Sequence, residues 1–302
     1  MTSQTPRRVT VVGIGAIGLP MALRLASAGL EVTGVDPFPG PREKAADAGL
    51  RAEESADSAA TADAVICMVA TPDQLRAAVL GEDGLVASMR RGATLVVMST
   101  VGVAPVEEVA AAAAAAGIGL LDVPVTGGVA RARTGELTLF ASGDPLLLAA
   151  HRDLFAPMGR IRGCGPTPGR GQAMKAVNQL LASVHLVAAA EALAFAEALG
   201  LDPADAFEAV SGGAGGSWML SDRGPRMLEG LDAEVTSTIG IFVKDAELVC
   251  AAAEEVGFDA PLVAAARDRF LAAAGAGLLR RDDSQVIRTY RAPDDRAPED
   301  ES

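Results

Sequence analysis

The sequence predicts an α/β protein in which an N-terminal doubly wound sheet is joined by a long helix to an all-α C-terminal domain. Up to about residue 162, β-rich runs alternate with helical patterns, as in βαβ units whose parallel sheet carries helices on both faces. Residues 172–199 contain no Gly or Pro, so we expect one helix of about 40 Å there. Only helical patterns follow Gly200.

Each element of the first domain, residues 1–166, is predicted from its local pattern. Runs rich in β-branched residues predict strands, and these runs are RVTVVGIG, LEVTGVD, AVICMVA, TLVVMST, GLLDVPV, LTLFASG and GRIRGCG. Helical periodicity predicts helices over 21–28, 42–48, 72–79, 105–116 and 145–155.

The second domain, residues 167–290, begins in the Gly- and Pro-rich stretch CGPTPGRG. Its long helix is capped by Gly200, and Asp202 followed by Pro203 marks the start of the next helix. Further helices are expected over 218–229, 239–256 and 261–274. The acidic, Pro-containing tail of residues 291–302 is expected to be disordered.

The composition excludes several kinds of partner. The 302 residues carry a formal net charge of -13 and give a pI near 4.7, which argues against nucleic acid and anionic membranes as partners. Cys67, Cys164 and Cys250 fit no metal-ligand spacing, so we expect neither a disulfide nor a bound metal. The alanine-rich helices are interrupted by polar residues and no signal-peptide pattern is present, so we expect a cytoplasmic protein without a membrane span.

The stretch GIGAIG follows the first predicted strand and opens the first helix. Glycines in that place permit a tight turn and the close approach of a pyrophosphate, whose charge faces the helix N-terminal amides. A purely structural glycine turn is the alternative. The strand before the motif and the helix after it favour a Rossmann-type dinucleotide site, formed by Gly13, Ile14, Gly15, Ala16, Ile17 and Gly18.

Asp36 indicates which dinucleotide is bound. It ends the second predicted strand 18 residues after Gly18, close to the offset of roughly 20 residues at which an acidic side chain accepts hydrogen bonds from the adenosine ribose. This favours NAD, because a 2′-phosphate would meet a like charge, although Arg42 nearby leaves NADP possible. The alternative is that Asp36 only caps the turn before Pro37.

Lysine is rare in this chain. Of 26 basic residues, only Lys44, Lys175 and Lys244 are lysine. A lysine can give up its proton when burial lowers its pKa, whereas a guanidinium stays charged. Lys175 stands in the long apolar helix, so it is a candidate acid–base group, with a snorkelling surface lysine as the alternative.

Three further stretches carry candidate ligand residues. STVG at 99–102 and DVPVTGG at 122–128 each follow a predicted strand, where an open α/β sheet places its binding loops. IFVKD at 241–245 holds the third lysine. Each stretch taken singly is equally a plain loop or a solvated helix face, but together they favour one ligand site.

These motifs, in this order and spacing, resemble the β-hydroxyacid dehydrogenases, a family that includes 3-hydroxyisobutyrate dehydrogenase and tartronate semialdehyde reductase and is related to 6-phosphogluconate dehydrogenase. The resemblance runs from about Arg8 to Tyr290 and covers GIGAIGLPMALRL, DVPVTGG, GQAMKAVNQ and the KD pair. It implies a 6-phosphogluconate dehydrogenase-like fold and a homodimer or homotetramer. GSWML, IFVKD and DDSQVI are most similar to the L-threonate dehydrogenase branch.

The resemblance also implies roles for individual residues. Lys175 would be catalytic, and Thr126, Gly127 and Gly128 would hold the substrate carboxylate. Asn178 and Gln179 would contact substrate, although the family usually has a second Asn in place of Gln179 and serine in place of Thr126. The remaining implied cofactor-binding residues are Met68, Val69, Thr100 and Lys244.

The sequence therefore predicts an NAD-dependent oxidoreductase that transfers a hydride between nicotinamide and the carbinol carbon of a small anionic hydroxy acid, with a threonate-like four-carbon sugar acid favoured. The alternatives are a 3-hydroxyisobutyrate dehydrogenase or a tartronate semialdehyde reductase. An imine reductase and a non-catalytic nucleotide-binding protein are disfavoured, because both would lack Lys175.

Overall fold

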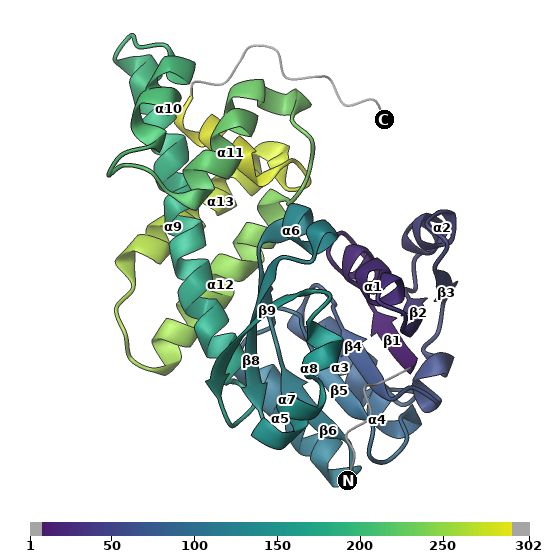
Figure 1. Cartoon of the computed structure of the whole chain (residues 1–302). Coiled ribbons are helices and arrows are strands. Elements are labelled where there is room, and N and C mark those ends of the chain that lie inside the picture. The colour runs from purple at the N-terminus through teal and green to yellow at the C-terminus, as the bar shows by residue number, and fades with distance from the viewer. Residues whose placement is uncertain (1–7, 292–302) are drawn as a thin grey trace. The chain divides into compact units, whose positions relative to one another are not determined.

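The computed structural model describes residues 8–291. Of the tail 291–302 that is predicted to be disordered, residues 292–302 lie outside the described residues, whereas Arg291 is described and pairs with Glu197. The chain divides into two compact units, Met1–Asn178 and Gln179–Ser302. The division falls inside one continuous helix, α9 (Arg170–Ala198), which confirms the long Gly- and Pro-free helix expected from the sequence (Figure 1).

The first unit is built on one sheet. Its strand order is β3-β2-β1-β4-β5-β6-β8-β7, with β9 paired to β8. The first six strands pair in parallel, β8 runs antiparallel to β6 and β7, and β9 runs parallel to β8. The strands are β1 (Arg8–Val12), β2 (Glu31–Val35), β3 (Arg51–Glu53), β4 (Ala64–Cys67), β5 (Thr94–Val97), β6 (Gly119–Asp122), β7 (Val125–Thr126), β8 (Leu137–Gly143) and β9 (Gly159–Gly165).

Helices cover both faces of this sheet, as predicted. They are α1 (Gly18–Ser27), α2 (Pro39–Asp47), the short helix η1 (Asp57–Ala60), α3 (Pro72–Leu80), α4 (Leu85–Ser88), α5 (Val103–Ala115), α6 (Gly128–Thr134), α7 (Pro145–Ala150) and α8 (Arg152–Phe155).

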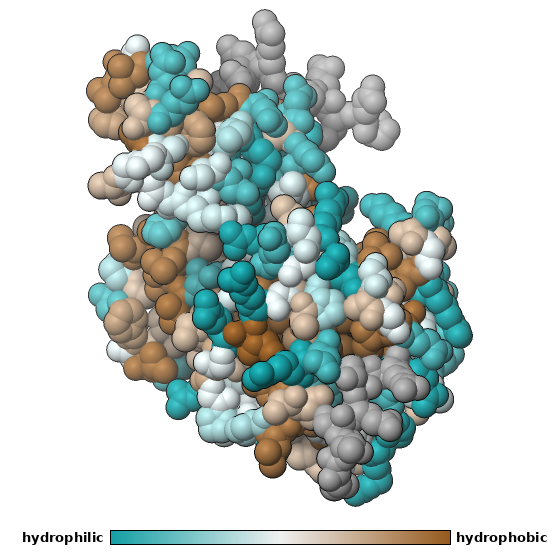
Figure 2. All heavy atoms as spheres, viewed as in Figure 1, coloured by the Kyte–Doolittle hydropathy of each residue, from teal (hydrophilic) through white to brown (hydrophobic). Residues whose placement is uncertain are grey.

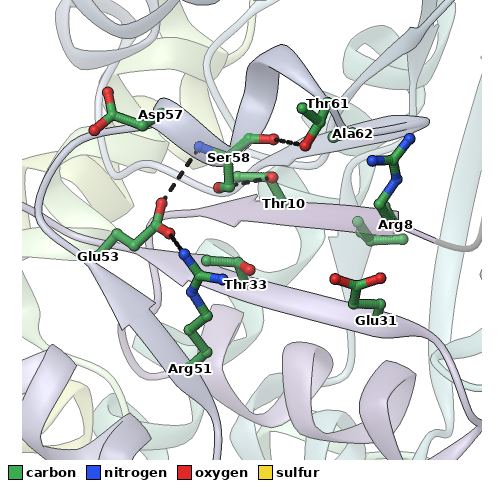
Figure 3. A pocket seen from close by; sticks show the side chains of 11 residues that line it. Arg8, Thr10, Glu31, Thr33, Arg51, Glu53, Asp57, Ser58, Thr61 and Ala62 are labelled. Carbon is green, nitrogen blue, oxygen red and sulfur yellow. Dashed lines mark hydrogen bonds and ion pairs between the residues drawn. The ribbon is translucent and has the colours of Figure 1, made fainter.

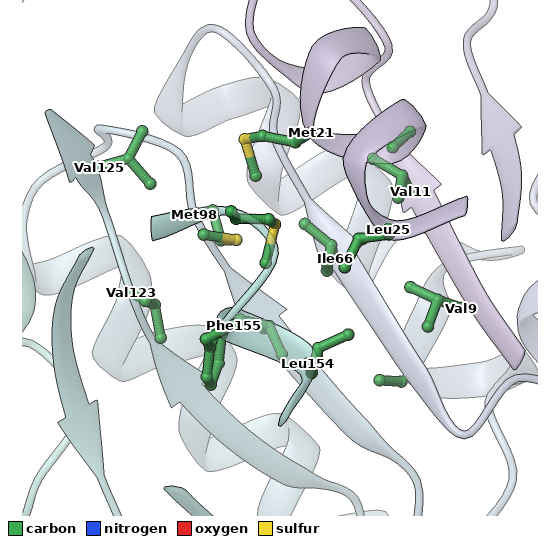
Figure 4. Packing of buried hydrophobic residues seen from close by; sticks show 14 of the residues in the cluster. Val9, Val11, Met21, Leu25, Ile66, Met98, Val123, Val125, Leu154 and Phe155 are labelled. Atoms are coloured by element: carbon green, nitrogen blue, oxygen red, sulfur yellow. The ribbon is translucent and has the colours of Figure 1, made fainter. Parts of the chain in front are cut away.

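Alternate side chains of each strand point to opposite faces, so the sheet separates two cores. In β4, Ile66 packs in the core with α1, α6 and α8, whereas Val65 and Cys67 pack in the core with α3, α4 and α5. Figure 4 shows the first core, in which Met21 and Leu25 of α1 lie over the sheet. Because both faces are buried, the central strand β4 is apolar throughout.

One predicted helix of the first unit is interrupted. The helix expected over 145–155 is two helices, α7 and α8, which meet at His151. The His151 ring nitrogen Nδ1 lies 2.9 Å from the carbonyl oxygen of Leu147, and burial lowers the pKa of the imidazole. His151 is therefore a structural residue at the junction.

The second unit is helical, as predicted. Besides α9 it contains α10 (Pro203–Ser211), α11 (Trp218–Glu229), η2 (Gly230–Asp232), α12 (Ile239–Glu255), α13 (Pro261–Ala273), η3 (Ala274–Leu278) and η4 (Asp283–Tyr290). The Asp202 side chain accepts hydrogen bonds from the amides of Ala204 (2.8 Å) and Asp205 (3.1 Å), which confirms it as the N-cap of α10.

Buried ion pairs fix the C-terminal helix η4 in this unit. Arg223 of α11 donates from Nε and Nη2 to the two carboxylate oxygens of Asp283, each at 2.9 Å. Arg226, one turn later, donates to Asp282 at 3.0 Å. Removing one partner would leave an unpaired buried charge, so these pairs hold η4 against α11 in one register.

The helix α9 is, by length and composition, the one helix among residues 8–291 that could cross a membrane. Half of its most apolar window is buried within the protein, and the core helix of a folded domain meets the same criterion. Lys175 and Gln179 also interrupt its apolar sequence. We therefore interpret α9 as a core helix.

Candidate active site

The carboxyl ends of the parallel strands bring most of the predicted site residues of the first unit to one edge of the sheet. Gly13 follows β1, Asp36 follows β2, Met68 follows β4, Ser99 follows β5, and Asp122 is the last residue of β6. The chain runs outward from β1 to β2 and β3, and then returns to place β4 on the other side of β1. Such a reversal leaves a crevice above the adjacent strands, and in open α/β sheets ligands bind there.

The glycine loop at this edge is fitted to a dinucleotide. Gly13 has φ +88°, and a Cβ at Gly13 would lie 2.4 Å from the carbonyl oxygen of Met68. A Cβ at Gly18 would lie 1.9 Å from the carbonyl oxygen of Gly13, so the turn into α1 needs glycine at both places. By contrast, nothing lies within 4 Å of a Cβ at Gly15. The exposed backbone at Gly15 is thus open to an approaching phosphate.

Asp36 closes the other side of this loop. Its carboxylate accepts hydrogen bonds from the amide of Ile14 (3.2 Å) and the amide of Phe38 (3.1 Å), so it bridges the glycine loop and the turn before α2. Arg42 donates to the carbonyl oxygen of Asp36 (2.8 Å) and pairs with Glu54 (3.3 Å). The capping role and the ribose-binding role are therefore compatible, because each carboxylate oxygen has a second lone pair.

The loops after β4 and β5 are joined to each other. The amide of Val69 donates to Ser99 Oγ at 2.7 Å, and the amide of Met68 donates to the carbonyl oxygen of Val12 at 2.7 Å. Thr100 follows the buried Ser99 and is itself partly exposed. The predicted cofactor residues Met68, Val69 and Thr100 thus lie on loops that are fixed at the same edge as Gly13.

The stretch DVPVTGG forms the end of β6, the short strand β7 and the start of α6. Thr126 is the last residue of β7 and pairs with Thr138 of β8. Gly127 (φ +134°) and Gly128 (φ +69°) have backbone conformations that favour glycine. Nothing lies within 4 Å of a Cβ at Gly128, so the backbone of this turn is accessible to a ligand.

Lys175 is buried, with 6% of its surface exposed, in the second turn of α9. Three residues before it, Gln172 is also buried and bonds to two other segments of the first unit, 99–102 and the end of β6. Its partner Asp122 accepts from the amides of Gly169 (2.9 Å) and Gln172 (3.1 Å) and from the Gln172 side chain (2.9 Å). Burial raises the pKa of Asp122, although these hydrogen bonds oppose the shift.

Neither Gln172 nor the carboxylate of Asp122 is among the site residues predicted from the sequence. Asp122 opens the DVPVTGG motif, and Gln172 lies one turn before Lys175 on the same helix face. A polar residue one turn before the candidate lysine was the available signal.

In the second unit, three predicted or neighbouring polar residues meet. Gln179 Nε2 donates to Asp245 Oδ2 at 2.5 Å, and Lys244 Nζ lies 2.7 Å from Asp245 Oδ1. The Asp245 carboxylate is buried and links the predicted substrate residue Gln179 to the predicted nicotinamide residue Lys244. Asn178 precedes Gln179 on α9, at the end of the first unit, and is partly exposed.

A separate pocket of about 270 Å³ lies on the first unit (Figure 3). Arg8, Glu31 and Arg51 line it, and these are the first residues of β1, β2 and β3. It therefore lies at the amino ends of the strands, opposite the edge that carries the glycine loop, and contains no predicted site residue.

Comparison with known proteins agrees with this geometry. The family model described as the NAD binding domain of 6-phosphogluconate dehydrogenase matches residues 8–167. The model described as the NAD-binding domain of NADP-dependent 3-hydroxyisobutyrate dehydrogenase matches residues 169–290. Together the two models span both units.

Individual relatives and a solved structure match over almost the whole chain. An L-threonate dehydrogenase of Cupriavidus necator is 36% identical, over 94% of this chain and 96% of that protein. A probable 3-hydroxyisobutyrate dehydrogenase of Mycobacterium bovis is 34% identical, over 94% of this chain and 98% of that protein. The crystal structure of 3-hydroxyisobutyrate dehydrogenase from Salmonella typhimurium superposes with a TM-score of 0.87 at 34% identity, over 93% of this chain and 99% of that chain.

These matches confirm the fold and the family predicted from the sequence. They also confirm an NAD(P) cofactor, for which the glycine loop and Asp36 provide a fitting site. The chain therefore belongs to the β-hydroxyacid dehydrogenase family, and it is an NAD(P)-dependent oxidoreductase of hydroxy acids.

Proposed function

We propose that this protein is an NAD-dependent dehydrogenase of four-carbon sugar acids such as threonate, and that Lys175 is its general acid and base. The observation that carries the proposal is the position of Lys175. This lysine is buried and lies three residues after Gln172, whose side chain bonds α9 to Asp122 at the carboxyl edge of the sheet. The similarity to L-threonate dehydrogenases at up to 36% identity supports the substrate class.

In the proposed oxidation, Lys175 Nζ takes the proton of the substrate hydroxyl as the carbinol carbon gives up its hydrogen with both bonding electrons. The nicotinamide, when bound, accepts that hydride. In reduction, the protonated Lys175 returns the proton to the new hydroxyl oxygen. A lysine suits this exchange because its amine can take up and release a proton, which a guanidinium cannot.

Other residues of the chain are proposed to bind and orient. The hydroxyl of Thr126 and the accessible backbone of Gly127 and Gly128 would hold the substrate carboxylate. Thr100 and Lys244 would contact the nicotinamide. The division of labour we propose is an NAD-binding domain over 1–166 and a helical substrate and assembly domain over 167–290.

The coenzyme preference is the first testable consequence. We expect NAD to give a higher kcat/KM than NADP, because the Asp36 carboxylate would repel a 2′-phosphate and the Arg42 guanidinium is already bonded to Asp36 and Glu54. Asp36→Asn keeps an amide oxygen for the Ile14 or Phe38 amide and removes the charge. It should lower the NAD to NADP preference by about tenfold or more.

Steady-state kinetics with both coenzymes measure this ratio. Asp47→Asn is the matched control, because it removes an exposed carboxylate at the far end of α2 and should leave the preference near that of the wild type. A wild-type protein that favours NADP would overturn the assignment to NAD.

The substrate preference is the second consequence. Threonate offers additional hydroxyl groups where hydroxyisobutyrate offers a methyl group, and the amide of Gln179 is held by Asp245 rather than rotating freely. We therefore expect a higher kcat/KM for four-carbon polyhydroxy acids than for hydroxyisobutyrate. Gln179→Leu, which keeps the volume and removes the amide, should raise the KM for threonate by about tenfold, the value of one hydrogen bond.

A screen of three- and four-carbon hydroxy acids, followed by absorbance of the reduced nicotinamide, decides the substrate. The change in KM for hydroxyisobutyrate caused by Gln179→Leu serves as the internal control, and it should be small. If the wild type prefers hydroxyisobutyrate or tartronate semialdehyde, the protein belongs to one of those branches instead.

We also propose that the enzyme is a cytoplasmic homodimer or homotetramer whose substrate is a small anionic acid. Large apolar side chains remain exposed on helices and turns of the second unit, where Figure 2 shows brown spheres among teal ones. They include Phe195, Leu199, Val210, Ile241, Val256, Phe258 and Leu271. Exposed apolar side chains in such numbers favour a surface that is covered by another subunit.

A further inference from the structure

We propose that Gln172 is a positioning residue that, together with Asp122, fixes the segment 99–102 and the end of β6 relative to the first turns of α9, which carry Lys175. The inference rests on the proposed function, because it assigns Gln172 a role in the reaction of Lys175. Its support comes from hydrogen bonds within the first unit, and each residue involved is buried except Gly102, which is partly buried.

The first observation is that the Gln172 side chain joins its own helix to two other segments. Gln172 Nε2 donates to the carbonyl oxygen of Ser99 (3.0 Å) and to Asp122 Oδ1 (2.9 Å). Gln172 Oε1 accepts from the amides of Val101 (3.0 Å) and Gly102 (3.2 Å). The segment with Thr100, the segment that leads to Thr126 and the first turn of α9 are thereby held together.

The second observation is that the Asp122 carboxylate also binds the start of α9 directly. Asp122 Oδ2 accepts from the amides of Gly169 and Gln172 and from Ser142 Oγ at 3.0 Å, and Ser142 Oγ in turn accepts from the amide of Gly171 at 2.9 Å. These amides belong to the start of α9, where a helix has no internal acceptors for them. The acceptors therefore fix both the position and the rotation of the helix that carries Lys175.

The third observation is that these residues are tightly packed. Asp122, Ser99 and Ser142 have no exposed surface, and Gln172 is 2% exposed. A Cβ at Gly171 would lie 2.5 Å from the carbonyl oxygen of Phe140 and 2.8 Å from Asp122, so the helix start touches the strands directly. Lys175 is one turn further along the same face. Displacement of a reacting group by about 1 Å can lower a rate by about 10²-fold, so this anchor affects the chemistry.

The test reverses the donor and the acceptor of the hydrogen bond between the Gln172 and Asp122 side chains. Gln172→Glu keeps an acceptor for the amides of Val101 and Gly102 but turns the donor that faces Asp122 into a second carboxylate oxygen. Asp122→Asn alone places an amide NH₂ against the Gln172 NH₂. The double variant restores one donor and one acceptor, because the new amide can donate to the new carboxylate.

We expect each single variant to lower kcat by about 10²-fold while the dissociation constant of NAD changes by less than about threefold. The double variant should recover kcat to within about tenfold of the wild type, because only the donor to the Ser99 carbonyl is still missing. Thr10→Val is the control: it removes the partly buried hydrogen bond from Thr10 to Ser58 (3.0 Å) outside the site, so it tests a loss of stability alone. Its kcat should equal that of the wild type.

Amide hydrogen exchange gives a readout that does not depend on activity. The amides of Val101, Gly102 and Gly169 should be protected, and in folded Gln172→Glu the amide of Gly169 should exchange faster. Three results would each overturn the inference. The first is that the folded single variants have the same kcat as Thr10→Val. The others are a double variant as slow as the product of the two single effects, and unprotected amides in the wild type. If no hydroxy acid is turned over by the wild type, the proposed function fails, and hydrogen exchange still decides whether Gln172 joins these segments.

Discussion

Replacing Lys175 by arginine is expected to lower kcat by about 10²–10⁴-fold, the contribution typical of general acid–base catalysis. Arginine keeps the positive charge and nearly the same length, so it can still attract an anionic substrate. It cannot take up and release a proton at neutral pH, because the guanidinium stays charged. The dissociation constant of NAD should change little, since the glycine loop and Asp36 are untouched.

Steady-state rates over a pH series, paired with calorimetric titration of NAD, measure the two effects separately. Lys44→Arg is the matched control. Lys44 is exposed on α2, so the same substitution there should leave both quantities unchanged. Near-normal turnover of Lys175→Arg would reduce the role of Lys175 to electrostatic positioning, and His185, later on the same helix, would become the next candidate base.

Gly15→Val should abolish NAD binding while leaving the fold intact. Nothing lies within 4 Å of a Cβ at Gly15, and the backbone there is in an ordinary conformation, so the side chain is accommodated in the free protein. It would occupy the space through which a pyrophosphate approaches the amides at the start of α1. Losing two charge-assisted hydrogen bonds, at about 1.5–3 kcal/mol each, weakens binding by roughly 10²-fold or more.

Substitutions at two other glycines serve as comparisons for this prediction. Gly18→Val places a Cβ 1.9 Å from the carbonyl oxygen of Gly13, so it should lower the thermal unfolding temperature as well as NAD affinity. Gly163→Val, at an exposed position in β9 with nothing within 4 Å, should change neither. If Gly15→Val binds NAD like the wild type, the pyrophosphate does not approach at Gly15, and the proposed position of the cofactor is wrong.

Several features of this protein are determined by local sequence. Strand–helix alternation, apolar strands and a long stretch without Gly or Pro predict the sheet, its two helical faces and α9, because periodicity and chain-breaking residues act over a few positions. The glycine loop and Asp36 are recognisable for the same reason, since their spacing follows from a single βαβ unit. The rarity of lysine singles out Lys175 without any structure.

Short or locally ambiguous elements are only resolved by tertiary contacts. β7 has two residues and is a strand because it pairs with β8. β3 has three residues and extends the edge of the sheet beside β2. The antiparallel direction of β8 against β6 leaves no mark on the sequence, because pairing direction depends on how the connecting chain returns.

The supporting structure of the site is likewise decided by the fold alone. Gln172 and Asp122 are 50 residues apart, and Gln172 and Ser99 are 73 apart, yet they bond in the interior. Gln179 reaches Asp245 over 66 residues. A polar residue in an apolar helix is visible in the sequence, but its partner is not, because a buried donor must be satisfied by whichever acceptor the packed strands and helices bring within about 3 Å.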